Sequence, residues 1–255
     1  MQPVRKTYKS GRTGLMRKYL FLAYPVGLYV IFSLPVLFLS ASLKAVFGID
    51  YLITHIVGAM GMALCHIKVK RKQMTDPGPV PWKQIFTIAG IMLIPVVILT
   101  LSLTGKAFFK AVTGTFPAIV LGTFFWASLS EELLFREFLI CRMLKNGMPR
   151  RIILLLPALL FSLCHRPESV ALLAQRFITG VVLGFIFLKT KDLSLCTATH
   201  WVYNIIIYTF HCTFQEVSIL YSPGRAALNV LLCLLSVLGI VVAYSINKSK
   251  FAGYT

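Results

Sequence analysis

Apolar stretches long enough to cross a lipid bilayer recur along this sequence from Tyr19 to Ile246, with short polar breaks between them. A spanning helix needs about 20 mostly apolar residues, and helices suit lipid because they satisfy their own backbone polar groups. We therefore predict an all-α, polytopic helical bundle that forms one membrane domain over residues 1–255. Its spans number about eight, at 19–41, 49–67, 85–104, 115–143, 152–166, 169–188, 193–212 and 226–246.

The composition agrees with lipid as the main solvent. Hydrophobic residues make up 57% of the chain and charged residues 13%, where a soluble domain carries about 25% charged residues. The 26 Lys and Arg residues outnumber the 8 Asp and Glu residues and give a net charge of +18. These basic residues lie mainly in loops between apolar segments, where they determine orientation in the membrane. We therefore expect a lipid bilayer around the chain and no nucleic-acid partner.

The positions of the basic residues also predict the topology. Most of them fall on one side of the predicted spans, in segments 5–18, 68–83, 142–151, 189–191 and 248–250. An excess of Lys and Arg marks the cytoplasmic side, so both termini are expected in the cytoplasm, in a multi-pass protein of the cell (plasma) membrane. Residues 68–84 contain three prolines, which interrupt helices, and are predicted to be a cytoplasmic linker.

Three of the acidic residues lie inside the fourth predicted span. They are Glu131, Glu132 and Glu137, in the segment SEELLFREF. A carboxylate in the hydrocarbon region costs a few kcal/mol unless it is paired or hydrated, so such residues mark functional sites. Glu132 and Arg136 are four residues apart in the favourable order for an ion pair. Glu131 lies about 100° around the helix from Glu132, and we assign the chemistry to Glu131.

Two other predicted spans supply polar residues that match this carboxylate. His165 ends the fifth span in FSLCH, and His200 and Asn204 lie in the seventh span in HWVYN. Side chains four residues apart share a helix face, so the seventh helix would present an imidazole and a carboxamide together. His165 would reach the same place from a neighbouring helix. Three helices are thus expected to converge on one buried polar site.

These segments form three motifs in a fixed order: Glu131 to Arg136 (Glu-Glu-x-x-x-Arg), Phe161 to His165, and His200 to Asn204. Together they resemble the CAAX prenyl protease and bacteriocin-processing family of intramembrane proteases, also called the CPBP or Abi family. Gly180 and Gly184 also look like that family's pattern, where small residues allow helices to approach closely. The resemblance covers residues 115–210, which we take as the catalytic core.

The resemblance implies hydrolysis of a peptide bond near the cytoplasmic side of the membrane, in a membrane-associated or lipid-modified protein or peptide. Glu131 and His165 would hold and deprotonate the attacking water. His200 and Asn204 would donate hydrogen bonds to the tetrahedral oxyanion. Glu132 and Arg136 would keep the fourth helix in register as a structural ion pair.

A metal is the alternative way to activate the water. Glu131, His165 and His200 are residue types that ligate zinc and leave one position open for water. The sequence lacks His-Glu-x-x-His, the local motif of many zinc proteases. We therefore expect that no cofactor is required, with one divalent metal such as zinc as the alternative.

Other functions fit part of the pattern. A non-catalytic bacteriocin-immunity or scaffold protein would keep the fold and bind a peptide or a partner enzyme. Ion-coupled transport also uses buried Glu and His, but the chain shows no pair of interrupted helices in matching halves. The identity of the substrate stays open. It could be a lipid-modified C-terminus, a peptide precursor or a membrane-protein segment. The roles of Glu137 and Arg176 also stay open.

Overall fold

The computed structural model describes residues 82–114, 116–165 and 170–216, together with isolated positions between 27 and 67. Every element within these three ranges is helical. The predicted spans 19–41, 49–67 and 226–246 and both termini lie outside the continuously described ranges. The same holds for the predicted linker except its last three residues, which begin a helix at Trp82 rather than ending a loop. Pro81 precedes that helix, where a proline does not disturb helical hydrogen bonds.

Five helices account for most of the described residues, and each covers a predicted span with ends shifted by a few residues. The described elements are α4 (Trp82–Thr104), the separate short helix α5 (Lys106–Ala111), α6 (Phe116–Ala118), η2 (Ile119–Phe124), α7 (Phe125–Glu132), η3 (Leu133–Ile140), α8 (Cys141–Lys145), α9 (Arg150–Cys164), α10 (Val170–Thr190) and α11 (Leu193–Glu216). The elements from α6 to α8 form one continuous helix of 30 residues, Phe116–Lys145. This helix and the segment Leu172–Thr190 are long and apolar enough to cross a membrane, as judged from length and composition.

The long central helix is not a regular α-helix. The segments η2 and η3 have the wider π-helical hydrogen-bond pattern, and α7 with its two glutamates lies between them. π-Helical segments are rare and frequently occur at functional sites. No residue pattern in this span indicates a π-helical segment, so the sequence predicts a uniform helix there.

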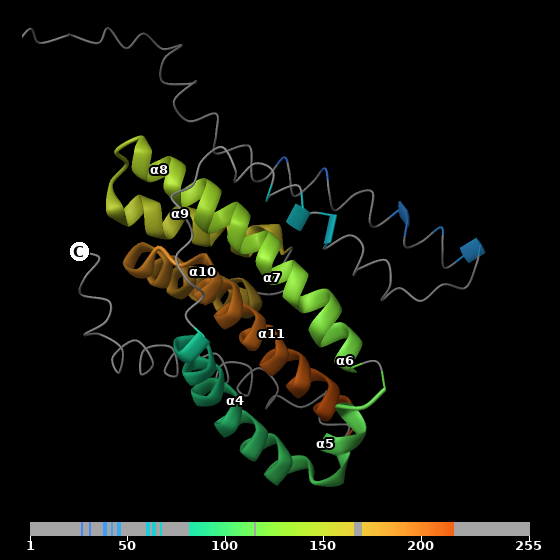
Figure 1. Cartoon of the computed structure of the whole chain (residues 1–255). Coiled ribbons are helices and arrows are strands. Elements are labelled where there is room, and N and C mark those ends of the chain that lie inside the picture. The colour runs from blue at the N-terminus through green and yellow to red at the C-terminus, as the bar shows by residue number, and fades with distance from the viewer. Residues whose placement is uncertain are drawn as a thin grey trace, which may run out of the picture.

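The helices pack in two connected groups. Helix α9 lies against α10, and α11 lies against α4 and α7 (Figure 1). Buried apolar side chains of η3, α9, α10 and α11 form one hydrophobic core, which includes Phe135, Phe161, Phe187 and Ile206. A functional side chain on any of these helices is therefore held by the same packed core.

Helix α9 is short, and its length determines where His165 lies. The turn Asn146–Pro149 connects α8 to α9, so Lys145 and Arg150 lie at the same end of the bundle. Glu131 precedes Lys145 by about four helical turns, and His165 follows Arg150 by about four turns. The two side chains therefore reach a similar depth. The short length of α9 therefore places His165 at the depth of Glu131.

Helices α9 and α10 approach closely at Gly180. A Cβ atom added there would lie 2.9 Å from the Cα of Ala158 and 3.3 Å from its carbonyl oxygen. Both are backbone atoms and cannot rotate away. Gly184, one turn later, would instead meet the movable Cδ1 of Leu154 at 3.3 Å. The close helix approach expected at these glycines is present, and Gly180 is the stricter of the two positions.

We expect Gly180→Ala to destabilise the bundle by about 1–3 kcal/mol, because the new methyl group forces two backbones apart. The gain in helix propensity, about 1 kcal/mol, does not offset this overlap. Thermal unfolding in detergent micelles measures the effect, with Gly184→Ala as the matched control. An unfolding temperature of Gly180→Ala equal to or above that of Gly184→Ala would contradict the packing described here.

Candidate active site

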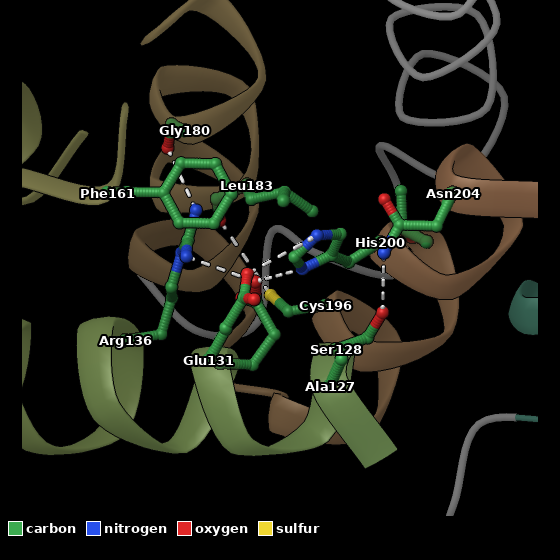
Figure 2. A network of polar contacts seen from close by, with 12 residues as sticks. Ala127, Ser128, Glu131, Arg136, Phe161, Gly180, Leu183, Cys196, His200 and Asn204 are labelled. Carbon is green, nitrogen blue, oxygen red and sulfur yellow. Dashed lines mark hydrogen bonds and ion pairs between the residues drawn. The ribbon is translucent and has the colours of Figure 1, made fainter. Parts of the chain in front are cut away.

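The carboxylate of Glu132 lies at the centre of a buried network that joins three helices. Its Oε1 atom lies 3.0 Å from Nη1 of Arg136, with both side chains buried. The Nη1 group is not aligned as a hydrogen bond, so the contact is a charge pair. Nη2 of Arg136 donates to the carbonyl oxygen of Gly180 at 3.2 Å, as Figure 2 shows. The ion pair expected from the spacing is present, and it also reaches α10.

The same Glu132 oxygen contacts His200 on α11. Nδ1 of His200 lies 2.9 Å from Oε1 of Glu132, and both side chains are buried. An ionised carboxylate only accepts hydrogen bonds, so Nδ1 carries a proton and donates it. The four-residue spacing predicts only the arginine partner of Glu132. The structure adds an imidazole to that carboxylate.

One helical turn away, Asn204 of α11 contacts Ser128 of α7. The Nδ2 group of Asn204 donates to Oγ of Ser128 at 3.2 Å, and Figure 2 shows this contact beside His200. Ser128 precedes Glu132 by four residues, and Asn204 follows His200 by four. Polar residues of α7 therefore contact polar residues of α11 at two successive helical turns.

Glu131 faces both histidines. Its Oε2 atom lies 3.6 Å from Nε2 of His165 and 3.8 Å from Nε2 of His200. These separations are too long for direct hydrogen bonds, and Oε2 is buried without a hydrogen-bond partner. Oε2 of Glu132 also lacks one, but the Glu132 contacts described above are made by its other oxygen. Glu131 is thus the carboxylate towards which two imidazoles converge.

His165 is held by the last turn of α9 and by α10. Its Nδ1 lies 2.7 Å from the carbonyl oxygen of Phe161, which only accepts, so this nitrogen also donates. Arg176 of α10 donates to the main-chain carbonyl of His165 at 2.9 Å. Oγ of Ser162 donates to the carbonyl of Leu173 at 2.6 Å. Two hydrogen bonds therefore tie the end of α9 to α10.

The ring of Phe161 separates the charged groups from the surrounding core. Its centroid lies 4.6 Å from that of His165 and 5.5 Å from that of His200. The guanidinium carbon of Arg136 lies 5.0 Å from the same centroid, within the range of a cation–π interaction. Phe161 thus restricts both imidazoles and covers the arginine, a role that its place in the second motif did not reveal.

Exposure differs across the site. The side chain of His165 is 26% exposed and that of Glu131 is 15% exposed, whereas His200 is 3% exposed and Glu132 is fully buried. His165 and Glu131 therefore lie on the more exposed side of the site, and His200, Glu132 and Arg136 are its buried part.

The donor and acceptor pattern is unusual for a buried site. Because each imidazole donates from Nδ1, each neutral ring presents the lone pair of Nε2. Two lone pairs and one carboxylate oxygen therefore converge, and only a group with hydrogens or positive charge can satisfy all three. A water molecule meets this requirement, and so does a metal cation. Over the described ranges, no group of three or more His, Cys, Asp or Glu side chains has the arrangement of a metal site.

The structure thus brings Glu131, His165 and His200 together as the sequence predicts, with Asn204 one turn from His200 and Glu132 paired with Arg136. Ser128 is a polar neighbour that the sequence analysis missed, although its four-residue spacing from Glu132 mirrors that of Asn204 from His200. Arg176 contacts the main chain of His165, and Glu137 is buried.

Residues 113–206 match the family described as type II CAAX prenyl endopeptidase Rce1-like. Searches of curated proteins and of solved structures found no match. The matched segment contains all three motifs and every residue of the site described above. Residues 113–206 are therefore similar to the CAAX protease family that the three motifs predict, and this likeness together with the two apolar helices indicates a membrane protein.

Proposed function

We propose that this protein is an intramembrane endopeptidase that hydrolyses a peptide bond with a water molecule activated by Glu131 and His165. The observation that carries the proposal is the buried Oε2 atom of Glu131. It has no hydrogen-bond partner and faces the Nε2 atoms of His165 and His200 at 3.6 and 3.8 Å. A water at this point can donate hydrogen bonds to the carboxylate and to one imidazole.

The bonds made and broken follow from this arrangement. The water oxygen attacks the scissile carbonyl carbon while Glu131 takes one of its protons. The carbonyl π electrons move onto the oxygen and form the tetrahedral oxyanion. When the C–N bond breaks, the proton returns to the leaving nitrogen. His165 lies on the more open side, where it orients the water and helps to move this proton.

His200 and Asn204 are proposed to stabilise the oxyanion. Since Nδ1 of His200 already donates to Glu132, its Nε2 atom donates only when the ring is protonated. Arg136 balances the charge of the Glu132 carboxylate while the His200 ring is neutral. Glu132 would thus orient His200 as well as hold the helix. Each oxyanion donor contributes about 3 kcal/mol to the transition state.

The proposed substrate is a lipid-modified C-terminal peptide. The support is the likeness of residues 113–206 to a family described as CAAX prenyl endopeptidases. The two glutamates lie on the helix Phe116–Lys145, which is long and apolar enough to span a membrane, and this suits a substrate that a lipid chain holds in the same layer. A peptide precursor and a membrane-protein segment are the other substrates to be compared. We also propose that the chain crosses the cell membrane about eight times, with both termini in the cytoplasm.

We propose that no metal is required, because a carboxylate and an imidazole suffice to deprotonate water. The alternative places one divalent cation on Glu131, His165 and His200. The Nδ1 hydrogen bonds of both imidazoles would also suit metal-bound histidines. If bound, such a cation would lower the pKa of its water.

Glu131→Gln is expected to slow cleavage by about 10²–10⁴-fold, because the amide cannot take the proton. A farnesylated, internally quenched peptide with a CAAX terminus is the probe, with the purified protein in detergent. Glu132→Gln is the matched comparison. It removes a buried charge from Arg136, at a cost of about 3–5 kcal/mol, and lowers the unfolding temperature, whereas Glu131→Gln leaves that temperature unchanged.

Full cleavage by the Glu131→Gln protein would contradict the assignment of the base. Full immunity or complex assembly by a Glu131→Gln protein, with no cleavage by the wild type, would favour the non-catalytic binding protein.

Metal removal is expected to leave activity intact. The purified protein is dialysed against EDTA and then 1,10-phenanthroline, the metal content is measured, and cleavage of the same peptide is followed. Rates within twofold of the untreated protein, with less than one equivalent of metal bound, are the expected result. Loss of cleavage that added zinc restores would instead establish the metal-dependent mechanism.

A further inference from the structure

Ser128 is a fully buried polar residue at the edge of the site, and the proposed reaction gives it no role. Its exposed fraction is 0%, although it lies on a helix that is apolar enough to span a membrane. Its Oγ atom accepts a hydrogen bond from Nδ2 of Asn204 at 3.2 Å. In Figure 2 the two side chains point towards one another from α7 and α11.

An asparagine needs such a partner if it is to act as an oxyanion donor. The terminal torsion of its side chain is broad and only roughly two-fold, so the carboxamide turns easily unless something holds it. The amide has two N–H groups. Ser128 takes one of them, which fixes the plane of the amide and leaves the other N–H for the substrate.

Ser128 occupies a definite place in the pairing of α7 with α11. Glu132 contacts His200 through Oε1 and Nδ1, and Ser128 contacts Asn204 one turn away. Both proposed oxyanion donors are therefore held by residues of α7, four positions apart. The two supporting groups, a hydroxyl and a carboxylate, differ in chemistry, but each accepts a hydrogen bond from its partner on α11.

We propose that Ser128 is a positioning residue that orients the Asn204 carboxamide towards the developing oxyanion. The inference rests on the proposed function, in which Asn204 donates to that oxyanion. Because the oxyanion exists only after attack, loss of Ser128 affects the chemical step more than substrate binding.

Ser130 provides a matched control on the same helix. It is also fully buried, but its Oγ atom donates to the carbonyl of Ala127 within its own helix at 2.9 Å. Removing either hydroxyl deletes one buried oxygen from the same span. A general effect of deleting a buried hydroxyl would therefore be seen in both variants.

The test measures kcat and KM for the farnesylated, internally quenched peptide with purified wild-type, Ser128→Ala and Ser130→Ala proteins. We expect Ser128→Ala to lower kcat about tenfold with KM within twofold. This loss is smaller than the about 10²–10³-fold cost of deleting an oxyanion donor itself. Ser130→Ala keeps kcat within twofold. An unchanged kcat in Ser128→Ala, or an equal loss in Ser130→Ala, would overturn the inference.

A double-mutant cycle with Asn204→Ala shows whether Ser128 acts through Asn204. If it does, Ser128→Ala lowers kcat no further once Asn204 is absent. A further tenfold loss in the Asn204→Ala background would overturn the inference. If Ser128→Ala does not fold, Ser128→Cys replaces it, because a thiol is nearly isosteric but a weak acceptor. The same loss of kcat is expected, and an unchanged kcat would again overturn the inference.

The outcomes separate this inference from the proposed function. If the wild-type protein does not cleave the peptide, or if Glu131→Gln cleaves it fully, the proposed function fails and the inference with it. If Glu131→Gln abolishes cleavage while Ser128→Ala leaves kcat unchanged, the proposed function stands and the inference alone fails.

Discussion

The buried carboxylate of Glu132 is the group on which the arrangement of the site depends. Taking a carboxylate and a guanidinium out of water costs several kcal/mol per ion, and only close, well-oriented partners offset this cost. Oε1 of Glu132 receives Arg136 and His200, and Arg136 reaches on to the Gly180 carbonyl. One oxygen atom and its partners therefore connect the central helix with α10 and α11. Because these buried ions are stable only with close partners, the positions of Glu132, Arg136 and His200 relative to one another are restricted.

The network also explains why two neighbouring glutamates differ. Glu132 is fully buried and its Oε1 atom makes two close contacts. Glu131 is 15% exposed and its Oε2 atom lacks a hydrogen bond. The Nε2 atoms of two imidazoles lie just beyond hydrogen-bond distance from it. The first carboxylate stabilises the arrangement, and the second is available to a water molecule and a substrate. The close approach of α9 and α10 at Gly180 brings His165 to the open side of this second carboxylate.

Much of this site is predictable because local spacing determines it. Apolar segments of sufficient length predict the helices, and the four-residue spacing of Glu132 and Arg136 predicts their ion pair. The spacing of His200 and Asn204 likewise predicts that they share a helix face. The contact of Glu132 with His200 could not be predicted in this way, because it depends on how far α11 is shifted along α7. The packing of the core determines this shift, and the residue pattern of a single helix does not reveal it.

Other features depend on backbone geometry. The π-helical segments on either side of α7 have no distinct residue signature, and the start of α4 at Trp82 places the last three residues of the predicted linker in a helix. Ser128 was missed for a different reason. A serine in an apolar helix usually bonds its own backbone, as Ser130 does, and only the position of α11 shows that Ser128 faces Asn204.

The central claim is that the convergence of Glu131 and the two histidines is a proteolytic site. The most direct measurement is a quantitative comparison of peptide termini in membranes from cells that contain either the wild-type protein or Glu131→Ala at equal levels. The account predicts at least one new terminus that is present with the wild type and absent with Glu131→Ala, from a membrane-associated or lipid-modified protein. Identical sets of termini in the two membranes, with both proteins folded and inserted, would contradict it.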